Sequence, residues 1–254
     1  MVDWSPVLIS MKTASLSIFI TFFLGLIVAW GIVKVKNDTT KIVLDGIFTL
    51  PLVLPPTVVG FFLLYIFGVR GPIGSFFINY FAVKIAFSWP ATVIAAVVMS
   101  FPLMYRSARG AFEQVDSNLL DAGRTLGMSE WKIFWKVLFA NALPGIISGG
   151  ILAYARGLGE FGATAMLAGN IAGQTRTLPM AVYSEVAAGN MGTAFDYVIV
   201  IIFISFIAIF IMDFISIRKE KQWRYGWSRN KLILSIIFDN LFYYNEEGLW
   251  VKNC

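Results

Sequence analysis

Residues 116–138 read DSNLLDAGRTLGMSEWKIFWKVL, and this stretch predicts two short helices joined by a tight turn. Asp116 is of a residue type that caps helix N-termini, and the apolar positions after it suit one face of a first helix. Gly127 is expected to end that helix, because glycine favours the left-handed conformation found after helix C-termini. Ser129 can cap a second helix. Four apolar residues recur along it at helical spacing: Trp131, Phe134, Trp135 and Leu138.

This helical knob, residues 119–136, has two interpretations. A short rigid pair of helices fits a groove on a partner protein. Alternatively, the two helices lie at the membrane surface with Trp131 and Trp135 as aromatic anchors. The knob lies within 106–142, a segment too long for a plain connection, so it is expected to have a structure of its own.

The chain on both sides of this segment is strongly apolar. Of its 254 residues, 58% are apolar and 14% are charged, and the mean hydropathy is +0.75. A soluble domain carries about 25% charged residues, and disorder needs few apolar ones. We therefore expect an all-α membrane protein, since lipid offers no partner for an open strand edge. Five stretches are long enough to span: 7–33, 42–68, 85–105, 143–168 and 197–217.

The basic residues predict the topology. Fifteen of the 20 Lys and Arg residues fall in 34–41, 106–142 and 218–254, where an outside N-terminus places cytoplasmic segments. Four fall on the other side. We expect a multi-pass protein of the cell membrane with its N-terminus outside and its C-terminus in the cytoplasm. Residues 1–217 are then the transmembrane domain, containing the loop 106–142, and 218–254 form a basic cytoplasmic tail of unassigned role.

Two segments leave the span count open. Pro51, Pro55 and Pro56 lie inside the second span, where each removes a backbone donor. They indicate either a broken helix that lines a pathway or an ordinary kink. Segment 69–84 is either a sixth span or a short helix at the interface.

The fourth span contains charges and many glycines. Arg156 and Glu160 are four residues apart and can pair, and an unpaired charge at the bilayer centre costs roughly 2.5–3.5 kcal/mol. One interpretation is that they form part of a pathway or of its gate. The other is that they are a structural pair that locks two helices together. Residues 157–162 match G-x-G-x-x-G, but no strand precedes them, so we reject a nucleotide site. Instead, the small residues form a track that lets helices approach closely: Gly145, Gly149, Gly150, Ala153, Gly157, Gly159 and Gly162.

Missing residue types exclude several functions. The chain has no His, and its one Cys, Cys254, is the last residue, so His triads, His metal sites and disulfides are excluded. No G-x-x-x-x-G-K-[ST] motif is present, so any ATP must be hydrolysed by another subunit. We expect no catalytic residues, no metal site and no cofactor. The net charge of +5 fits contact with an anionic leaflet and not with nucleic acid.

The knob also carries a family resemblance. The stretch from Asp121 to Gly127, followed after nine residues by Val137, resembles the cytoplasmic E-A-A-x-x-x-G-x9-I-x-L-P loop of ABC importer permeases. Asp121 stands for Glu, Gly123 for the second Ala, and Phe139-Ala140 for Leu-Pro. Three further stretches resemble the molybdate branch of these permeases, with sulfate and tungstate permeases as near relatives: 100–106, 153–164 and 169–179.

The resemblance implies a role for the knob and a set of partners. It implies that Asp121, Ala122, Gly123 and Gly127 dock the chain onto an ATPase subunit. It further implies a homodimer with two ATPase subunits, served by an extracytoplasmic binding protein for molybdate or another oxyanion. As a hypothesis, 169–195 lines the outer mouth and meets this protein, with Arg176 and Thr177 as pathway candidates. The alternative is a solvated loop.

Function therefore has three candidates. The first is the permease subunit of an ATP-driven importer that moves molybdate, or else tungstate or sulfate, by alternating access. The second is a stand-alone ion-coupled carrier or channel, for which Glu160 and Asp213 are the available membrane carboxylates. It leaves the knob unexplained. A membrane enzyme is the weakest candidate, because no His, metal cluster or carboxylate pair is present.

Overall fold

The computed structural model describes residues 3–211, 214, 242–244 and 250–252. The chain divides into two compact units, Met1–Phe210 and Ile211–Cys254. In the second unit, β1 (Phe242–Tyr244) and β2 (Trp250–Lys252) pair as antiparallel strands. The rest of the expected tail, 218–254, lies outside the described residues.

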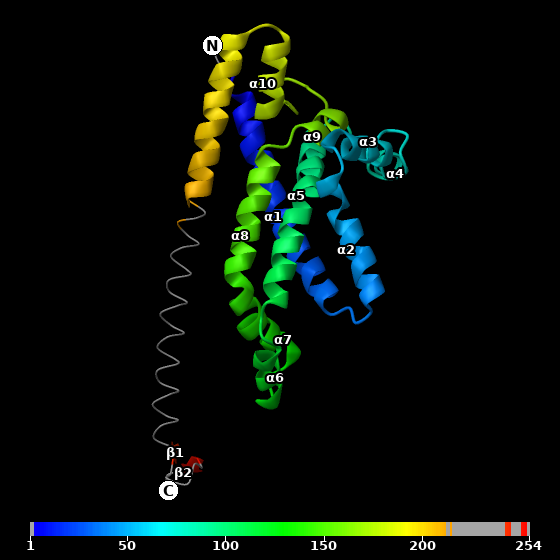
Figure 1. Cartoon of the computed structure of the whole chain (residues 1–254). Coiled ribbons are helices and arrows are strands. Elements are labelled where there is room, and N and C mark those ends of the chain that lie inside the picture. Colours follow the sequence, from blue (N-terminus) through cyan, green and yellow to red (C-terminus); the bar gives the residue numbers. More distant parts are fainter. Residues whose placement is uncertain (1–2, 212–213, 215–241, 245–249, 253–254) are drawn as a thin grey trace. The chain divides into compact units, whose positions relative to one another are not determined.

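The first unit is built from helices (Figure 1). Their order along the chain is α1 (Ser5–Val33), α2 (Asp38–Val53), α3 (Pro56–Phe67), α4 (Pro72–Phe81), α5 (Trp89–Glu113), α6 (Ser117–Thr125), α7 (Glu130–Ile133), the π-helical turn η1 (Phe134–Leu138), α8 (Phe139–Leu158), α9 (Gly162–Leu167), α10 (Leu178–Ala187) and a last helix, Met191–Ile211.

The prediction of an all-α membrane protein with about five spans is confirmed. α1, α5, the continuous run Glu130–Leu158 and the last helix are each long and apolar enough to cross a membrane. The pair α2 and α3 counts as a fifth span if its two helices are taken together, although they are bent by 110°. α4 has 10 residues, which makes it about 15 Å long, so segment 69–84 provides no sixth span.

Two predicted spans have different bounds in the structure. The third, predicted at 85–105, is α5 and continues to Glu113, because Arg109 and Glu113 find ionic partners on α2. The fourth, predicted at 143–168, begins at Glu130 and ends at Leu158. η1 carries the helix through from the knob, and Gly159 to Phe161 separate α8 from α9.

The last helix also differs from its predicted bounds. It begins at Met191 and not at 197, and it is described up to Ile211. Tyr197, near its start, is buried and donates a hydrogen bond to the backbone carbonyl of Asp3 at 3.0 Å. This contact ties the beginning of the last helix to the beginning of the chain.

α1, α5 and α8 form the central bundle (Figure 1). Their shared core contains Leu26, Met104, Tyr105 and Ile146, all buried. Two pairs of buried hydroxyls join α1 to α5, at 2.9 Å between Thr13 and Thr92 and 3.0 Å between Thr21 and Ser100. Because lipid competes poorly for such polar groups, these bonds fix how α1 and α5 face each other.

The broken helices pack against each other. Pro55 caps α3 and Pro56 begins it, so the predicted break of the second span lies there. A Cβ placed on Gly162, at the start of α9, would lie 2.8 Å from the Cβ of Pro56. A Cβ on Gly60 would lie 2.8 Å from the Cα of Ala163. The ends of the second and fourth predicted spans therefore meet at backbone distance, which requires both glycines.

We predict that Gly60→Ala destabilises the protein, because its methyl group would overlap the backbone of α9. Overpacking of this kind costs about 1–3 kcal/mol. The thermal unfolding midpoint of the purified chain in detergent, followed by tryptophan fluorescence, measures the effect. Gly46→Ala in α2 is the matched control, because no atom lies within 4 Å of the added methyl. An equal midpoint for both variants would contradict the packing.

Candidate functional site: the helical knob and the charged pairs

The helical knob forms as its residue pattern predicts. Asp116 is the N-cap of α6, and its side chain accepts the N–H of Asn118 at 2.9 Å. After α6 the backbone N–H groups of Gly127 and Met128 donate to the carbonyls of Arg124 and Gly123, a Schellman ending. Gly127 has φ +72° there, in the left-handed region that favours glycine. Ser129 is the N-cap of α7, but its side chain makes no capping hydrogen bond.

The two helices of the knob are held together on both sides. On the buried side, a Cβ on Gly123 would lie 3.2 Å from Cγ1 of Ile133, so the small residue permits close packing. On the exposed side, Arg124 donates to Asp121 at 2.7 Å and to Glu130 at 2.8 Å. Glu130, with Asp121, raises the pKa of the Arg124 guanidinium above its usual range. These contacts predict that the knob moves as one body.

The apolar face predicted for the second helix is divided between the core and the surface. Phe134 packs on Trp30 of α1, with ring centroids 4.6 Å apart, and Leu138 is buried. Trp131 and Trp135 are 62% and 46% exposed, and Leu126 at the turn is 80% exposed. The knob is thus anchored to α1 by Phe134 and presents uncovered apolar side chains at its tip, which favours a docking role.

A charged network that the sequence analysis did not single out joins α2 to α5. Arg109 pairs with Asp45 of α2 and, at 3.0 Å, with Glu113. Lys41 of α2 also pairs with Glu113 at 2.7 Å, and the Tyr105 hydroxyl donates to Asp45 at 2.9 Å. The spacing of Arg109 and Glu113, four residues apart, was a signal for this network. Its partners on α2 are set by tertiary packing alone.

Arg156 and Glu160 do pair, although the helix that carries Arg156 ends between them. Their side chains are 2.5 Å apart from Arg156 Nη1 to Glu160 Oε2. The other carboxylate oxygen of Glu160 accepts the N–H of Ala163 at 2.8 Å, within the first turn of α9. Glu160 is 2% exposed, whereas the side chain of Arg156 is 25% exposed. The pair therefore joins α8 to α9 and leaves one edge of the guanidinium accessible.

The Arg176 region lies at the opposite end of α1 from the knob. Arg176 donates to Asn170 at 2.8 Å, and the N–H of Leu178 donates to Ser10, near the start of α1, at 2.7 Å. The knob contacts Trp30, near the end of α1. α1 has 29 residues, about 43 Å, which is longer than the roughly 30 Å hydrocarbon core of a bilayer. Thr177 is buried, and its hydroxyl has no hydrogen-bond partner among the described residues.

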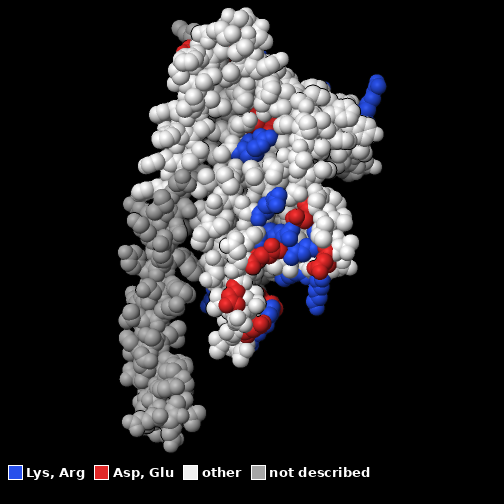
Figure 2. All heavy atoms as spheres, viewed as in Figure 1, with Lys and Arg blue, Asp and Glu red and all other residues white. Residues whose placement is uncertain are grey.

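Several charges of the first unit occur in ion pairs. Figure 2 shows basic and acidic side chains side by side on the viewed face, between wide uncharged areas. The ion pairs of the described residues are Lys41–Glu113, Arg109–Asp45, Arg109–Glu113, Arg124–Asp121, Arg124–Glu130 and Arg156–Glu160. Pairing of this kind reduces the cost of placing charges beside lipid.

We predict that Arg156→Met destabilises the protein far more than the double variant Arg156→Met with Glu160→Gln. The single change leaves a buried carboxylate without its cation, which costs about 3–5 kcal/mol. In the double variant the glutamine oxygen still accepts the Ala163 N–H. Thermal unfolding in detergent compares the two, and equal losses would show that the pair is not a unit.

Known proteins are similar to this chain in sequence, and others are similar to it in fold. The family described as "Binding-protein-dependent transport system inner membrane component" matches residues 21–221. The chain is 43% identical to "Molybdenum transport system permease protein ModB" of Escherichia coli (strain K12) over 225 residues, 87% of this chain and 97% of that protein. It is 41% identical to "Putative molybdenum transport system permease protein YvgM" of Bacillus subtilis (strain 168) over 211 residues, 83% and 92% of the two chains.

A solved structure with little sequence similarity shows the same fold. In the "Crystal structure of a bacterial ABC transporter involved in the import of the acidic polysaccharide alginate", a chain superposes with a TM-score of 0.71 at 12% identity. The superposition covers 84% of this chain and 78% of that one. The family match and the relatives together show that the chain belongs to the family of binding-protein-dependent transport system inner membrane components.

Proposed function

We propose that the chain is the transmembrane permease subunit of an ATP-driven importer for molybdate. The observation that carries this proposal is the 43% identity to a molybdenum transport permease, which extends over 97% of that protein. The sequence has no nucleotide-binding motif of its own. ATP hydrolysis therefore belongs to a separate ATPase subunit, and no bond is made or broken within this chain.

The knob is the part that meets the ATPase. Asp121, Ala122, Gly123 and Gly127 shape it, and the exposed Leu126 and Trp131 at its tip supply apolar contact area. Because Glu130–Leu158 is one continuous helical run, a displacement of the knob passes directly into a span. The contact of Phe134 with Trp30 passes the same displacement to α1.

The pathway forms between two copies of the chain, since five helices enclose little space. Arg156 is the cation in the fourth predicted span, and its pairing with Glu160 lowers the net charge that a passing anion meets. This suits transport, because strong binding would slow release. Rocking of the two copies about the pathway then alternates access between the two sides.

The Arg176 region faces the binding protein in this proposal. The distribution of basic residues supports a cytoplasmic knob and an N-terminus outside, and Arg176 lies at the far end of α1 from the knob. Its bond to Asn170 holds the loop between α9 and α10 in shape. Thr177 stays a pathway candidate beside Arg176, with a buried hydroxyl that has no hydrogen-bond partner among the described residues. Residues 1–217 form the permease domain, and the basic tail 218–254 stays without an assigned role.

The alternatives have less support. Tungstate and sulfate have the same tetrahedral geometry as molybdate, so the binding protein decides among them. A stand-alone carrier needs a membrane carboxylate that can exchange ions. Glu160 is already paired with Arg156, and Asp45 with Arg109. Asp213 lies outside the described residues.

Reconstitution tests the proposal. We predict that vesicles containing this chain, its ATPase subunit and its binding protein accumulate radiolabelled molybdate only when ATP is supplied to the ATPase side. Vesicles with the chain alone should accumulate none. Accumulation without the ATPase would favour the stand-alone carrier, and uptake of sulfate in preference to molybdate would favour the alternative substrate.

Substitution of Gly127 tests the role of the knob. Gly127→Leu forces an L-residue into the left-handed region, which costs about 1–2 kcal/mol, and should alter the turn that separates α6 from α7. We predict that less ATPase copurifies with this variant and that its ATP hydrolysis is uncoupled from uptake. Gly173→Leu is the matched control, because Gly173 has φ +73° and open space around it but lies in the Arg176 loop. Equal ATPase recovery with both variants would count against docking through the knob.

A further inference from the structure

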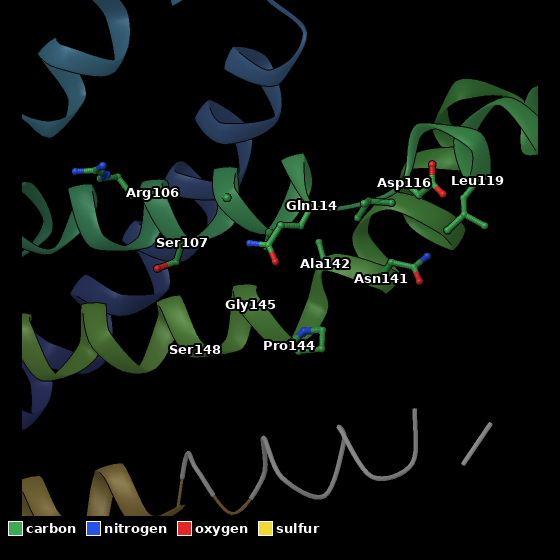
Figure 3. A pocket seen from close by; sticks show the side chains of 13 residues that line it. Arg106, Ser107, Gln114, Asp116, Leu119, Asn141, Ala142, Pro144, Gly145 and Ser148 are labelled. Atoms are coloured by element: carbon green, nitrogen blue, oxygen red, sulfur yellow. The ribbon is translucent and has the colours of Figure 1, made fainter. Parts of the chain in front are cut away.

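A polar hollow of about 700 Å³ lies where α5 ends and α8 begins, beside the start of α6. Thirteen residues line it, and Figure 3 shows them in a close view. Its polar side chains come from all three helices or their ends: Arg106, Ser107, Gln114, Asp116, Asn141 and Ser148. Small residues, among them Gly110 and Gly145, also line it.

Arg106 gives one end of this hollow a positive charge. Arg109, three residues further along α5, is neutralised by Asp45 and Glu113. By contrast, Arg106 is exposed and has no carboxylate partner among the described residues. Asp116 is the acidic residue of the lining, and it keeps its negative charge while its carboxylate caps α6 by accepting the Asn118 N–H. Arg106 and Asp116 lie at opposite ends of the hollow (Figure 3).

The lining also contains hydrogen-bond donors other than Arg106 that have no partner of their own. The side chains of Ser107, Gln114 and Ser148 have no hydrogen-bond partner in the part of the chain that the structure describes, whereas the Asn141 side-chain amide donates to the Val137 carbonyl at 2.6 Å. Ser107 and Gln114 point from α5 toward the helix that carries Gly145 and Ser148 (Figure 3). A guanidinium with hydroxyl and amide donors nearby is the set that binds oxyanions in proteins.

We propose that this hollow is a release site on the knob side of the membrane, where a tetrahedral oxyanion rests on Arg106 before it leaves. The inference rests on the proposed import function and adds a residue and a location to it. The site is open to water, so binding is weak and release is fast. Asp116 and Leu119 of the lining belong to the cap and first turn of α6. Movement of the knob therefore changes the shape of the hollow and couples release to the ATPase.

A charge-selective labelling experiment tests this site without relying on transport. In a Cys254→Ser background, which removes the only native thiol, Ser148→Cys places a reactive thiol in the hollow. The complete complex, in vesicles of zwitterionic lipid, is treated with anionic or cationic methanethiosulfonate reagents. We predict that Arg106→Gln lowers the ratio of anionic to cationic labelling rates by about tenfold, as expected when one charge within several ångströms is removed.

Three comparisons sharpen the test. Arg106→Lys should keep most of the ratio, because it keeps the charge. Arg70→Gln is the matched control, since it removes an equal charge in the turn between α3 and α4 and should leave the ratio unchanged. Molybdate should protect the thiol in the parent complex but not in Arg106→Gln.

The outcomes separate this proposal from the import function. An unchanged ratio in Arg106→Gln, or no protection by molybdate, overturns the release site even when ATP-driven uptake is normal. The release site is also overturned if anionic phospholipid, and not molybdate, protects the thiol, because the hollow then binds the phosphate of a lipid headgroup. Protection by molybdate in a complex that never accumulates molybdate supports the site and contradicts the import function.

Discussion

Close contact of helix backbones around α5 is the constraint on which the rest of the structure depends. In a membrane, moving an apolar side chain from lipid to a helix interface gains little free energy, because both environments are apolar. Helices therefore associate through close packing and polar contacts. A Cβ on Gly145 of α8 would lie 2.7 Å from the Cβ of Ala111 on α5. On the other side of α5, two hydroxyl pairs join it to α1. α5 therefore sets the positions of the helices that carry the charged pairs.

The same close packing explains why the two breaks in the helices are stable. Where α2 gives way to α3, and α8 to α9, backbone polar groups lose their helical partners. Such groups are tolerated at membrane depth only where protein or water satisfies them. Glu160 accepts the Ala163 N–H, and Gly60 and Gly162 let the two broken segments meet. The two broken segments therefore pack against each other.

Charge has two different uses in this protein. Arg156, Arg109 and Arg124 are each paired, and each pair joins two helical elements: α8 with α9, α2 with α5, and α6 with α7. These charges hold structure. Arg106 differs because it is in no ion pair among the described residues and lines a hollow beside side chains with free hydrogen-bonding groups. Arg70 and Arg176 are likewise in no ion pair of the described residues, but neither lines this hollow.

The sequence by itself determined the membrane class, the approximate number of spans and the helical knob. Those features follow from local properties: apolar runs of spanning length, the capping residue Asp116, and Gly127, whose left-handed conformation ends α6. The pairing of Arg156 with Glu160 was also predictable, because four residues separate them along the chain.

Tertiary structure alone decided the bounds of α5 and of the run Glu130–Leu158. Apolar composition ends where the first charged residue appears, but a helix continues when its charges find partners, as Arg109 and Glu113 do on α2. The 110° bend between α2 and α3, the contact of Gly60 with Ala163 and the hollow beside Arg106 join residues far apart in the chain. Local patterns carry no information about such contacts, because they arise only when separate helices pack together.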